Sequence, residues 1–261
     1  MGWKLAVSTL GMPGAAVRDA VRVAAGHGCH GIELRVHPDE EVRLDLPAPR
    51  ARDARAVVED AGLQVACLAG YARVCAPGPN APVIAELRAL IELAARMGAP
   101  SVRVFPGGED GRDGAALERI GAVLPDLRAH GVRLLVETHD SHPTGERALR
   151  LAEPFAAPGL VAVLWDALHP WRNGEPPSRT RRVLGEYLGY FQVKDAVRGD
   201  RWTPVPPGDG EVPLDECGSL LGPWSGWVSL EWERAWHPQI EPLAVPLRAT
   251  AAWFRRWRPP K

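Results

Sequence analysis

The strongest constraint in this sequence is its alternation of short β-rich runs with longer helical patterns. Eight such runs follow one another, at residues 4–7, 31–34, 64–68, 101–105, 132–136, 161–165, 190–193 and 227–230. This alternation predicts βαβ units, in which helices join parallel strands. Eight such units in a closed barrel need about 250 residues, and the chain has 261. We therefore predict the α/β class and one (β/α)8 TIM-barrel domain over residues 1–261. Length alone also allows two small domains, but no linker divides the chain.

The segments between these runs have the apolar spacing of helices that cover a barrel. Apolar residues recur every three or four positions, which places them on one helix face. They are Val83, Leu87, Leu90, Ile91 and Ala94 in one segment, and Leu117, Ile120, Leu124 and Leu127 in another. Gly62, Gly98 and Gly131 each lie between a helical pattern and the next run. Glycine suits the end of a helix because it tolerates positive φ.

The balance of charge argues against a nucleic-acid partner. The chain has 31 Lys and Arg against 32 Asp and Glu, whereas nucleic-acid binders usually carry a basic excess or stripe. The one aromatic and basic cluster, residues 253–258, could stack on bases. We interpret it instead as the end of the last helix, with aromatic side chains packed and arginines in water.

The sequence also indicates a reduced, cytoplasmic protein without a membrane segment. No apolar stretch approaches the ~20 residues that a membrane span requires, and no secretory signal is visible after Lys4. The four cysteines form no Cys-x-x-Cys pair, which disfavours a thiolate zinc site.

Polar side chains interrupt or end the last four predicted strands. Glu137, Asp166, Gln192 and Glu231 each follow or interrupt a buried apolar run, and a buried acid is costly unless it is paired or bound to metal. If these four point inward at the barrel mouth, they converge. Three converging carboxylates would repel one another and raise one another's pKa. A divalent cation would resolve that conflict.

These positions resemble the xylose isomerase-like superfamily, which includes ketose 3-epimerases, hydroxypyruvate isomerase and inosose dehydratase. The resemblance rests on Glu137, Asp166-x-x-His169, Lys194-Asp195, Glu231 and the loop Gly208-Asp209-Gly210-Glu211-Val212. It covers the whole chain, but it is carried mainly by the half from Glu137 onward. It implies a metal-dependent sugar isomerase or epimerase, with a small sugar-like molecule as substrate and a homodimer or homotetramer as possible assembly.

The resemblance also implies a set of metal ligands, which would be Glu137, Asp166, Gln192 and Glu231. Gln192 departs from the pattern, because the family usually has histidine there. A glutamine can still coordinate through its amide oxygen. The set would then be all-oxygen, which favours Mn²⁺ or Mg²⁺ over Zn²⁺. It could also bind metal weakly or not at all.

Roles in the reaction follow from the same resemblance. Glu137 and Glu231 would flank the substrate, one removing a proton next to a carbonyl and the other returning it on the opposite face. Each other candidate also has a structural interpretation, such as a buried hydrogen bond or an ion pair. We expect substrate contacts from Glu33, His139, His169 and Lys194. Four tryptophans could line a sugar-stacking wall: Trp165, Trp171, Trp232 and Trp236.

Three further functions stay open. A lyase on the same scaffold would remove the same proton and then expel a hydroxyl or cleave a C-linked sugar. An abasic-site endonuclease would need many histidine ligands, and the chain has only eight His. A barrel that binds a ligand without catalysis is the last alternative, and Gln192 is its best support. Specificity would depend on loops 71–80, 106–113, 169–177 and 198–212.

Overall fold

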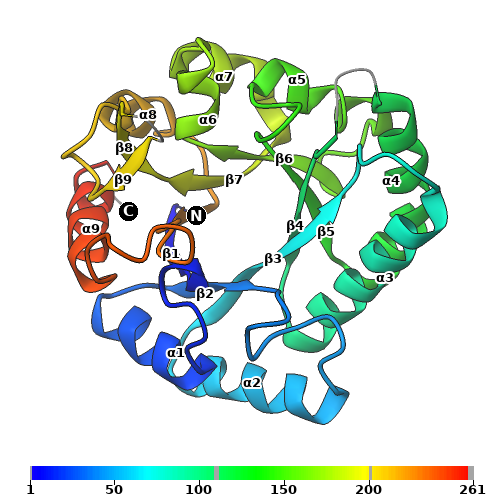
Figure 1. Ribbon diagram of the computed structural model, residues 1–261, viewed down its shortest axis with the longest axis horizontal. Helices are drawn as coiled ribbons and strands as arrows, with labels where there is room; N and C mark the ends of the chain where they lie inside the picture. Colours follow the sequence, from blue (N-terminus) through cyan, green and yellow to red (C-terminus); the bar gives the residue numbers. More distant parts are fainter. Residues whose placement is uncertain (1, 109–111, 200–201, 258–261) are drawn as a thin grey trace.

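The chain forms a closed barrel of eight parallel strands, which confirms the predicted fold (Figure 1). The computed structural model describes residues 2–108, 112–199 and 202–257. Around the barrel the strands follow the order β1-β10-β7-β6-β5-β4-β3-β2, and β1 pairs with both β2 and β10 to close it. The barrel strands are β1 (Lys4–Ser8), β2 (Gly31–Arg35), β3 (Gln64–Arg73), β4 (Ser101–Phe105), β5 (Arg133–Glu137), β6 (Val161–Asp166), β7 (Leu188–Val193) and β10 (Trp227–Leu230).

Helices surround the barrel. They are α1 (Val17–Gly26), α2 (Ala48–Asp60), α3 (Asn80–Met97), α4 (Asp113–His130), α5 (Gly145–Leu149), α6 (Leu168–Arg172), α7 (Pro177–Leu184), α8 (Leu214–Leu220) and α9 (Ala244–Trp257), with short 3₁₀ turns η1 (Thr9–Gly11), η2 (Glu153–Phe155) and η3 (Gly185–Tyr187). The predicted apolar stripes lie on α3 and α4, and most of their members are buried. Gly62, Gly98 and Gly131 have φ of 72°, 69° and 63°, so each uses the left-handed conformation that lets a helix end.

The strands are buried on both faces, and the two faces carry different residues. Outward side chains such as Val136 and Trp165 pack against the helices in the main core. Inward side chains such as Leu135 and Leu164 form a smaller core inside the barrel. Because side chains alternate along a strand, Glu137 lies on the same inward face as Leu135. Because Glu137 is also the last residue of β5, its carboxylate lies at the barrel mouth.

Two predicted loops contain regular structure. Residues 168–172 form α6, because the Asp166 carboxylate accepts hydrogen bonds from the backbone N–H groups of Leu168 (2.7 Å) and His169 (3.3 Å) and so caps the helix. Residues 195–205 include a hairpin of β8 (Asp195–Val197) and β9 (Thr203–Val205). The predicted loop at 71–80 begins later, since β3 continues to Arg73. Residues 109–111 of the predicted loop 106–113 and residues 200–201 of the predicted loop 198–212 lie outside the described residues.

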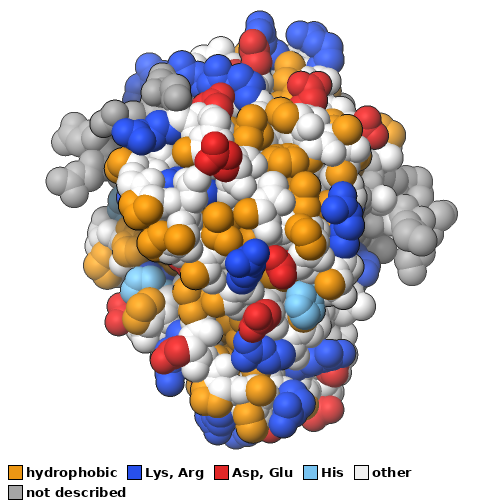
Figure 2. Space-filling model, turned by 90° about the vertical axis from the view of Figure 1, so that its right-hand side faces the viewer, with side chains coloured by type: hydrophobic (Ala, Val, Ile, Leu, Met, Phe, Trp, Pro, Cys, Tyr) orange, Lys and Arg blue, Asp and Glu red, His pale blue; other side chains and the backbone are white. Residues whose placement is uncertain are grey.

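The C-terminal cluster is the end of α9, as predicted. Trp253 and Phe254 are buried against Trp3, with ring centroids 5.8 Å and 6.1 Å away, while Arg255 and Arg256 are exposed. Arg258 lies outside the described residues. On the face in Figure 2, acidic and basic side chains are interspersed. Among the described helices, none is both long and apolar enough for a membrane span.

Candidate metal centre

Three carboxylates converge at the carboxyl-terminal ends of the strands, where TIM-barrel active sites lie. Glu137 and Asp166 are the last residues of β5 and β6, and Glu231 directly follows β10. All three are buried. One oxygen from each lies within 4.8 Å of the other two. We refer to Glu137, Asp166 and Glu231 as the carboxylate set.

Two cations of the chain already contact this set. The Lys194 ammonium lies 2.9 Å from Asp166 Oδ2 and 2.5 Å from Glu231 Oε2, and it also contacts Glu233 Oε1 at 3.0 Å. Arg103 Nε lies 3.2 Å from Glu137 Oε2. Side chains therefore supply part of the compensating charge that the sequence had led us to expect from a metal.

Sequence reasoning missed Arg103, although a signal was present. It interrupts the apolar run Ser101-Val102-Arg103-Val104-Phe105 on β4, and a buried guanidinium there needs a partner. Arg103 also donates to the Gly70 carbonyl oxygen (3.0 Å) and stacks over the Phe105 ring at 4.0 Å. It thus orients Glu137 from the neighbouring strand.

Burial and charge act against each other on these groups. Burial lowers the pKa of Lys194, but Asp166, Glu231 and Glu233 together raise it well above its ordinary value. The ammonium therefore stays charged. Burial raises the pKa of Glu137 from 4.5 to about 8, although Arg103 opposes the shift. Burial and the Glu231 charge likewise raise the pKa of Glu33.

Gln192 faces the same region from β7, but with its amide nitrogen. Nε2 donates to Glu33 Oε1 (3.0 Å) and to Glu231 Oε1 (3.1 Å). The amide oxygen is buried without a hydrogen-bond partner among the described residues. The sequence had suggested that this oxygen binds metal. In the structure the residue instead bridges two carboxylates as a donor.

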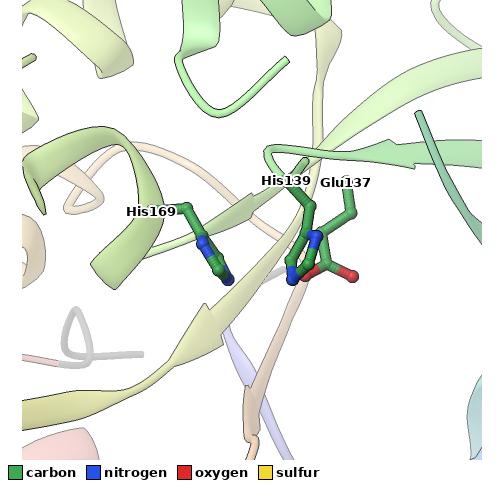
Figure 3. Close-up of side chains that lie close together, drawn as sticks. All are labelled: Glu137, His139 and His169. Carbon is green, nitrogen blue, oxygen red and sulfur yellow. The ribbon is translucent and has the colours of Figure 1, made fainter. Parts of the chain in front are cut away.

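Two histidines, His139 and His169, lie close to Glu137 (Figure 3). His139 follows β5 and His169 lies on α6, and their ring centroids are 4.2 Å apart in an edge-to-face arrangement. One ligand atom from each of Glu137, His139 and His169 lies within 4.8 Å of the other two. We refer to these three as the histidine set.

A cavity of about 360 Å³ opens over these residues. Glu137, His139 and Glu231 line it together with Tyr71, Phe105 and Trp236. Of the four tryptophans expected there, only Trp236 does so. The others pack elsewhere: Trp165 against Phe191, Trp171 against Trp202, and Trp232 with its indole N–H on the Glu241 carbonyl. Trp165 points outward because its neighbour Asp166 points inward.

The donor chemistry fits a divalent metal. Carboxylate oxygens and imidazole nitrogens are common metal ligands. Several buried polar atoms also lack a hydrogen-bond partner within the described ranges; they include Glu33 Oε2, Glu137 Oε2, His139 Nδ1, Gln192 Oε1 and both ring nitrogens of His169. Such orphaned atoms are costly unless a ligand or water satisfies them. The buried cluster is therefore consistent with a divalent metal site.

Comparisons with known proteins agree with this architecture. Residues 21–257 match the family model described as xylose isomerase-like TIM barrel. A search of curated proteins found no match.

Solved structures with low sequence identity share the fold. The probable 3-DHS dehydratase AsbF of Bacillus anthracis, involved in petrobactin synthesis, is 19% identical, with a TM-score of 0.79 over 97% of this chain and 98% of that one. The IolI protein with a binding zinc atom is 16% identical, with a TM-score of 0.81 over 97% and 99%. D-allulose 3-epimerase from Methylomonas sp., in complex with D-allulose, is 16% identical, with a TM-score of 0.77 over 98% and 96%.

Proposed function

Because the chain belongs to the xylose isomerase-like TIM-barrel family, we propose that it is a metal-dependent sugar isomerase or epimerase. The substrate is a small polyhydroxylated carbonyl compound. The reaction begins with removal of a proton from the carbon next to the carbonyl.

One observation carries this proposal: the carboxylate set converges beneath an accessible cavity. Glu137 and Glu231 both line the cavity and approach it from different strands, β5 and β10. Epimerisation needs one group to take a proton from one face of a carbon and another to return it on the opposite face. Two carboxylates at the same cavity suit that task.

The remaining residues bind and orient the substrate. Glu137, Asp166 and Glu231 would hold Mn²⁺ or Mg²⁺, with Gln192 as a fourth ligand once its amide turns. When bound, such an ion polarises the carbonyl and neighbouring hydroxyl oxygens of the substrate. Tyr71, Phe105 and Trp236 supply apolar walls for the carbon skeleton. The candidates for hydrogen bonds to substrate hydroxyls are Glu33, His139, His169 and Lys194.

A lyase would use the same first step, and the dehydratase among the similar structures supports keeping it as the alternative. After proton removal, loss of a neighbouring hydroxyl gives dehydration instead of isomerisation. Only the product distinguishes the two reactions.

Proton NMR in D₂O tests the proposal. Metal-stripped protein would be mixed with ketoses, inososes and glycosyl ketones, before and after Mg²⁺ or Mn²⁺ is restored, with Mn²⁺ chelated before the spectra. We expect metal-dependent loss of a C–H signal next to a carbonyl, and the product spectrum then separates isomerase from lyase. If folded, metal-loaded protein exchanges no proton in any of these compounds, a barrel that only binds becomes the better description.

The Glu231→Gln variant tests the role of the second carboxylate. This change keeps the size of the side chain but removes its charge, so turnover should fall by at least about 10²-fold, with the circular dichroism spectrum unchanged. Glu59→Gln, on the exposed face of α2, is the matched control. Activity in Glu231→Gln equal to that of the control would contradict the assignment.

A further inference from the structure

A second group of metal donors lies beside the carboxylate set and is chemically different from it. The histidine set combines one carboxylate, Glu137, with two imidazoles, His139 and His169. Two nitrogens and one oxygen suit Zn²⁺ or Co²⁺, whereas Mg²⁺ prefers an all-oxygen environment. One donor atom from each of the three residues lies within 4.8 Å of the other two, and binding one ion at about 2.0–2.2 Å would draw them closer together.

His169 is the observation that points to a ligand. Its side chain is only 3% exposed, and neither ring nitrogen has a hydrogen-bond partner among the described residues. Its closest acidic contact is Asp166 Oδ2, at 3.9 Å from Nε2. Burying an imidazole without a hydrogen bond costs free energy, because the ring nitrogens lose their contacts with water and gain none in the protein. Its ring instead faces that of His139, 4.2 Å away.

His139 has the orientation that a metal-binding histidine usually has. Its Nδ1 lies 2.7 Å from Asp140 Oδ1, a distance at which the carboxylate can orient the ring. Ligating histidines commonly place the other ring nitrogen on a carboxylate, which fixes the ring. Asp140 holds this position with φ of 45°, an unusual backbone conformation for a residue other than glycine.

The lysine and arginine side chains of the site pair mainly with members of the carboxylate set. Lys194 contacts Asp166 and Glu231 at 2.9 Å and 2.5 Å. Arg103 pairs with Glu137 at 3.2 Å and with Glu231 at 4.0 Å, and the charge of Lys194 acts to lower the pKa of both imidazoles. The ion pairs of the Lys194 ammonium are with Asp166, Glu231 and Glu233, so an ion on the histidine set would not compete for the carboxylates that hold it.

We propose that Glu137, His139 and His169 form a site for a zinc-type divalent ion, which shares Glu137 with the carboxylate set and is open to the cavity. Three protein ligands leave the fourth tetrahedral position vacant, which is typical of catalytic zinc sites. Glu137 and His139 line the cavity, so an ion held by this set would be accessible from it. The proposal concerns metal binding and does not depend on which reaction the barrel catalyses.

Titration of the metal-stripped chain with Co²⁺ and Zn²⁺ tests this site. A tetrahedral Co²⁺ ion absorbs visible light strongly, and Zn²⁺ affinity is read by competition with a chromogenic chelator. We expect His139→Gln and His169→Gln each to weaken binding by at least about tenfold and to remove the visible Co²⁺ bands. Glu231→Gln, which alters only the carboxylate set, and His130→Gln, exposed at the end of α4, should leave both readouts unchanged.

Asp140→Asn provides a variant outside the buried ligands. Asparagine also tolerates the left-handed backbone, but it holds the imidazole less firmly, so Zn²⁺ affinity should fall by about 10-fold to 100-fold. Loss of binding in Glu231→Gln with no loss in the histidine variants would overturn the inference while leaving the proposed isomerase intact. Equal losses in both groups would mean one shared ion and would also overturn it. So would a wild-type chain that binds neither metal.

Discussion

At the scale of single residues, the barrel mouth holds more acid than base. Within the described part of the chain, five carboxylates, from Glu33, Glu137, Asp166, Glu231 and Glu233, lie near one arginine and one lysine, Arg103 and Lys194. Uncompensated buried charge is expensive, so the remaining negative charge must be neutralised by protons or by a bound cation. The raised pKa values of Glu33 and Glu137 mean that these two carboxylates take up protons more readily, which neutralises part of the charge.

Metal binding should therefore depend on pH through Glu137. Its pKa is raised to about 8, so at pH 7 the metal-free side chain is mostly protonated, and a metal must displace that proton. We expect Mn²⁺ affinity to increase as pH rises from about 6 to about 8 and to level off above that. Calorimetry in buffers of different ionisation enthalpy would count the released proton. An affinity that is constant across this range would contradict the prediction.

Gln192→His should tighten transition-metal binding. The present amide nitrogen donates to Glu33 and Glu231, whereas a neutral imidazole can offer a lone pair to a metal. We expect about a tenfold or greater gain in Mn²⁺ affinity, measured by electron paramagnetic resonance of free Mn²⁺. Unchanged affinity would mean that position 192 does not face the ion.

At the scale of elements, the loop after the β8–β9 hairpin is fixed by one carboxylate. Asp195 accepts hydrogen bonds from the backbone N–H groups of Ala196, Gly208, Gly210 and Val212, at 2.8–3.1 Å. Burial raises the pKa of Asp195, and these four donors oppose that shift. Because Asp195 follows Lys194, the same interactions fix the backbone from which the ammonium reaches the carboxylate set.

Gly210→Ala should disturb this loop. A Cβ at Gly210 would overlap the Asp195 carboxylate and lie 2.8 Å from the Ala196 carbonyl oxygen. We expect a loss of about 1–3 kcal/mol in the free energy of unfolding, measured by urea denaturation. Gly199→Ala is the matched control, since nothing lies within 4 Å of a Cβ there. If both variants are as stable as the wild type, Asp195 does not hold the loop in this way.

At the scale of the whole molecule, stability depends on closure of the barrel. Pairing of β1 with β10 joins residues more than 200 positions apart, and α9 covers this seam through Trp253 and Phe254 on Trp3. Contacts so distant in sequence form only when most of the chain is ordered. Local opening should therefore expose little of the interior.

The rate at which buried thiols react measures how often the barrel opens locally. The four cysteines, Cys29, Cys67, Cys75 and Cys217, are all buried. Burial raises the pKa of Cys29 and Cys75 to about 12 and that of the other two further, so little reactive thiolate forms at pH 8. A thiol reagent should label the native protein very slowly and all four cysteines after denaturation. Rapid labelling of one cysteine in native protein would reveal a separate opening near it.

The sequence by itself determined the features that depend on local pattern. Runs of β-branched and apolar residues separated by helical stripes specified eight strands, as in 101–105 and 227–230, which the structure reproduces without change. The sequence also indicated that Glu137, Asp166 and Glu231 converge if they point inward, and the structure brings them together. Loop segments were less predictable, because α6 forms through a cap from Asp166, a side-chain interaction that the apolar pattern does not encode.

Only the tertiary structure decided how the inward side chains pair. Arg103 meets Glu137 from a neighbouring strand, Lys194 reaches Asp166 and Glu231 from between them, and the Gln192 amide turns its nitrogen toward Glu33 across the barrel. These contacts join residues up to 159 positions apart. Electrostatic interactions and hydrogen bonds depend on separations of a few ångströms, and strand pairing around the closed barrel sets those separations. For this reason the sequence could predict which charges gather at the mouth, but not which of them compensate one another.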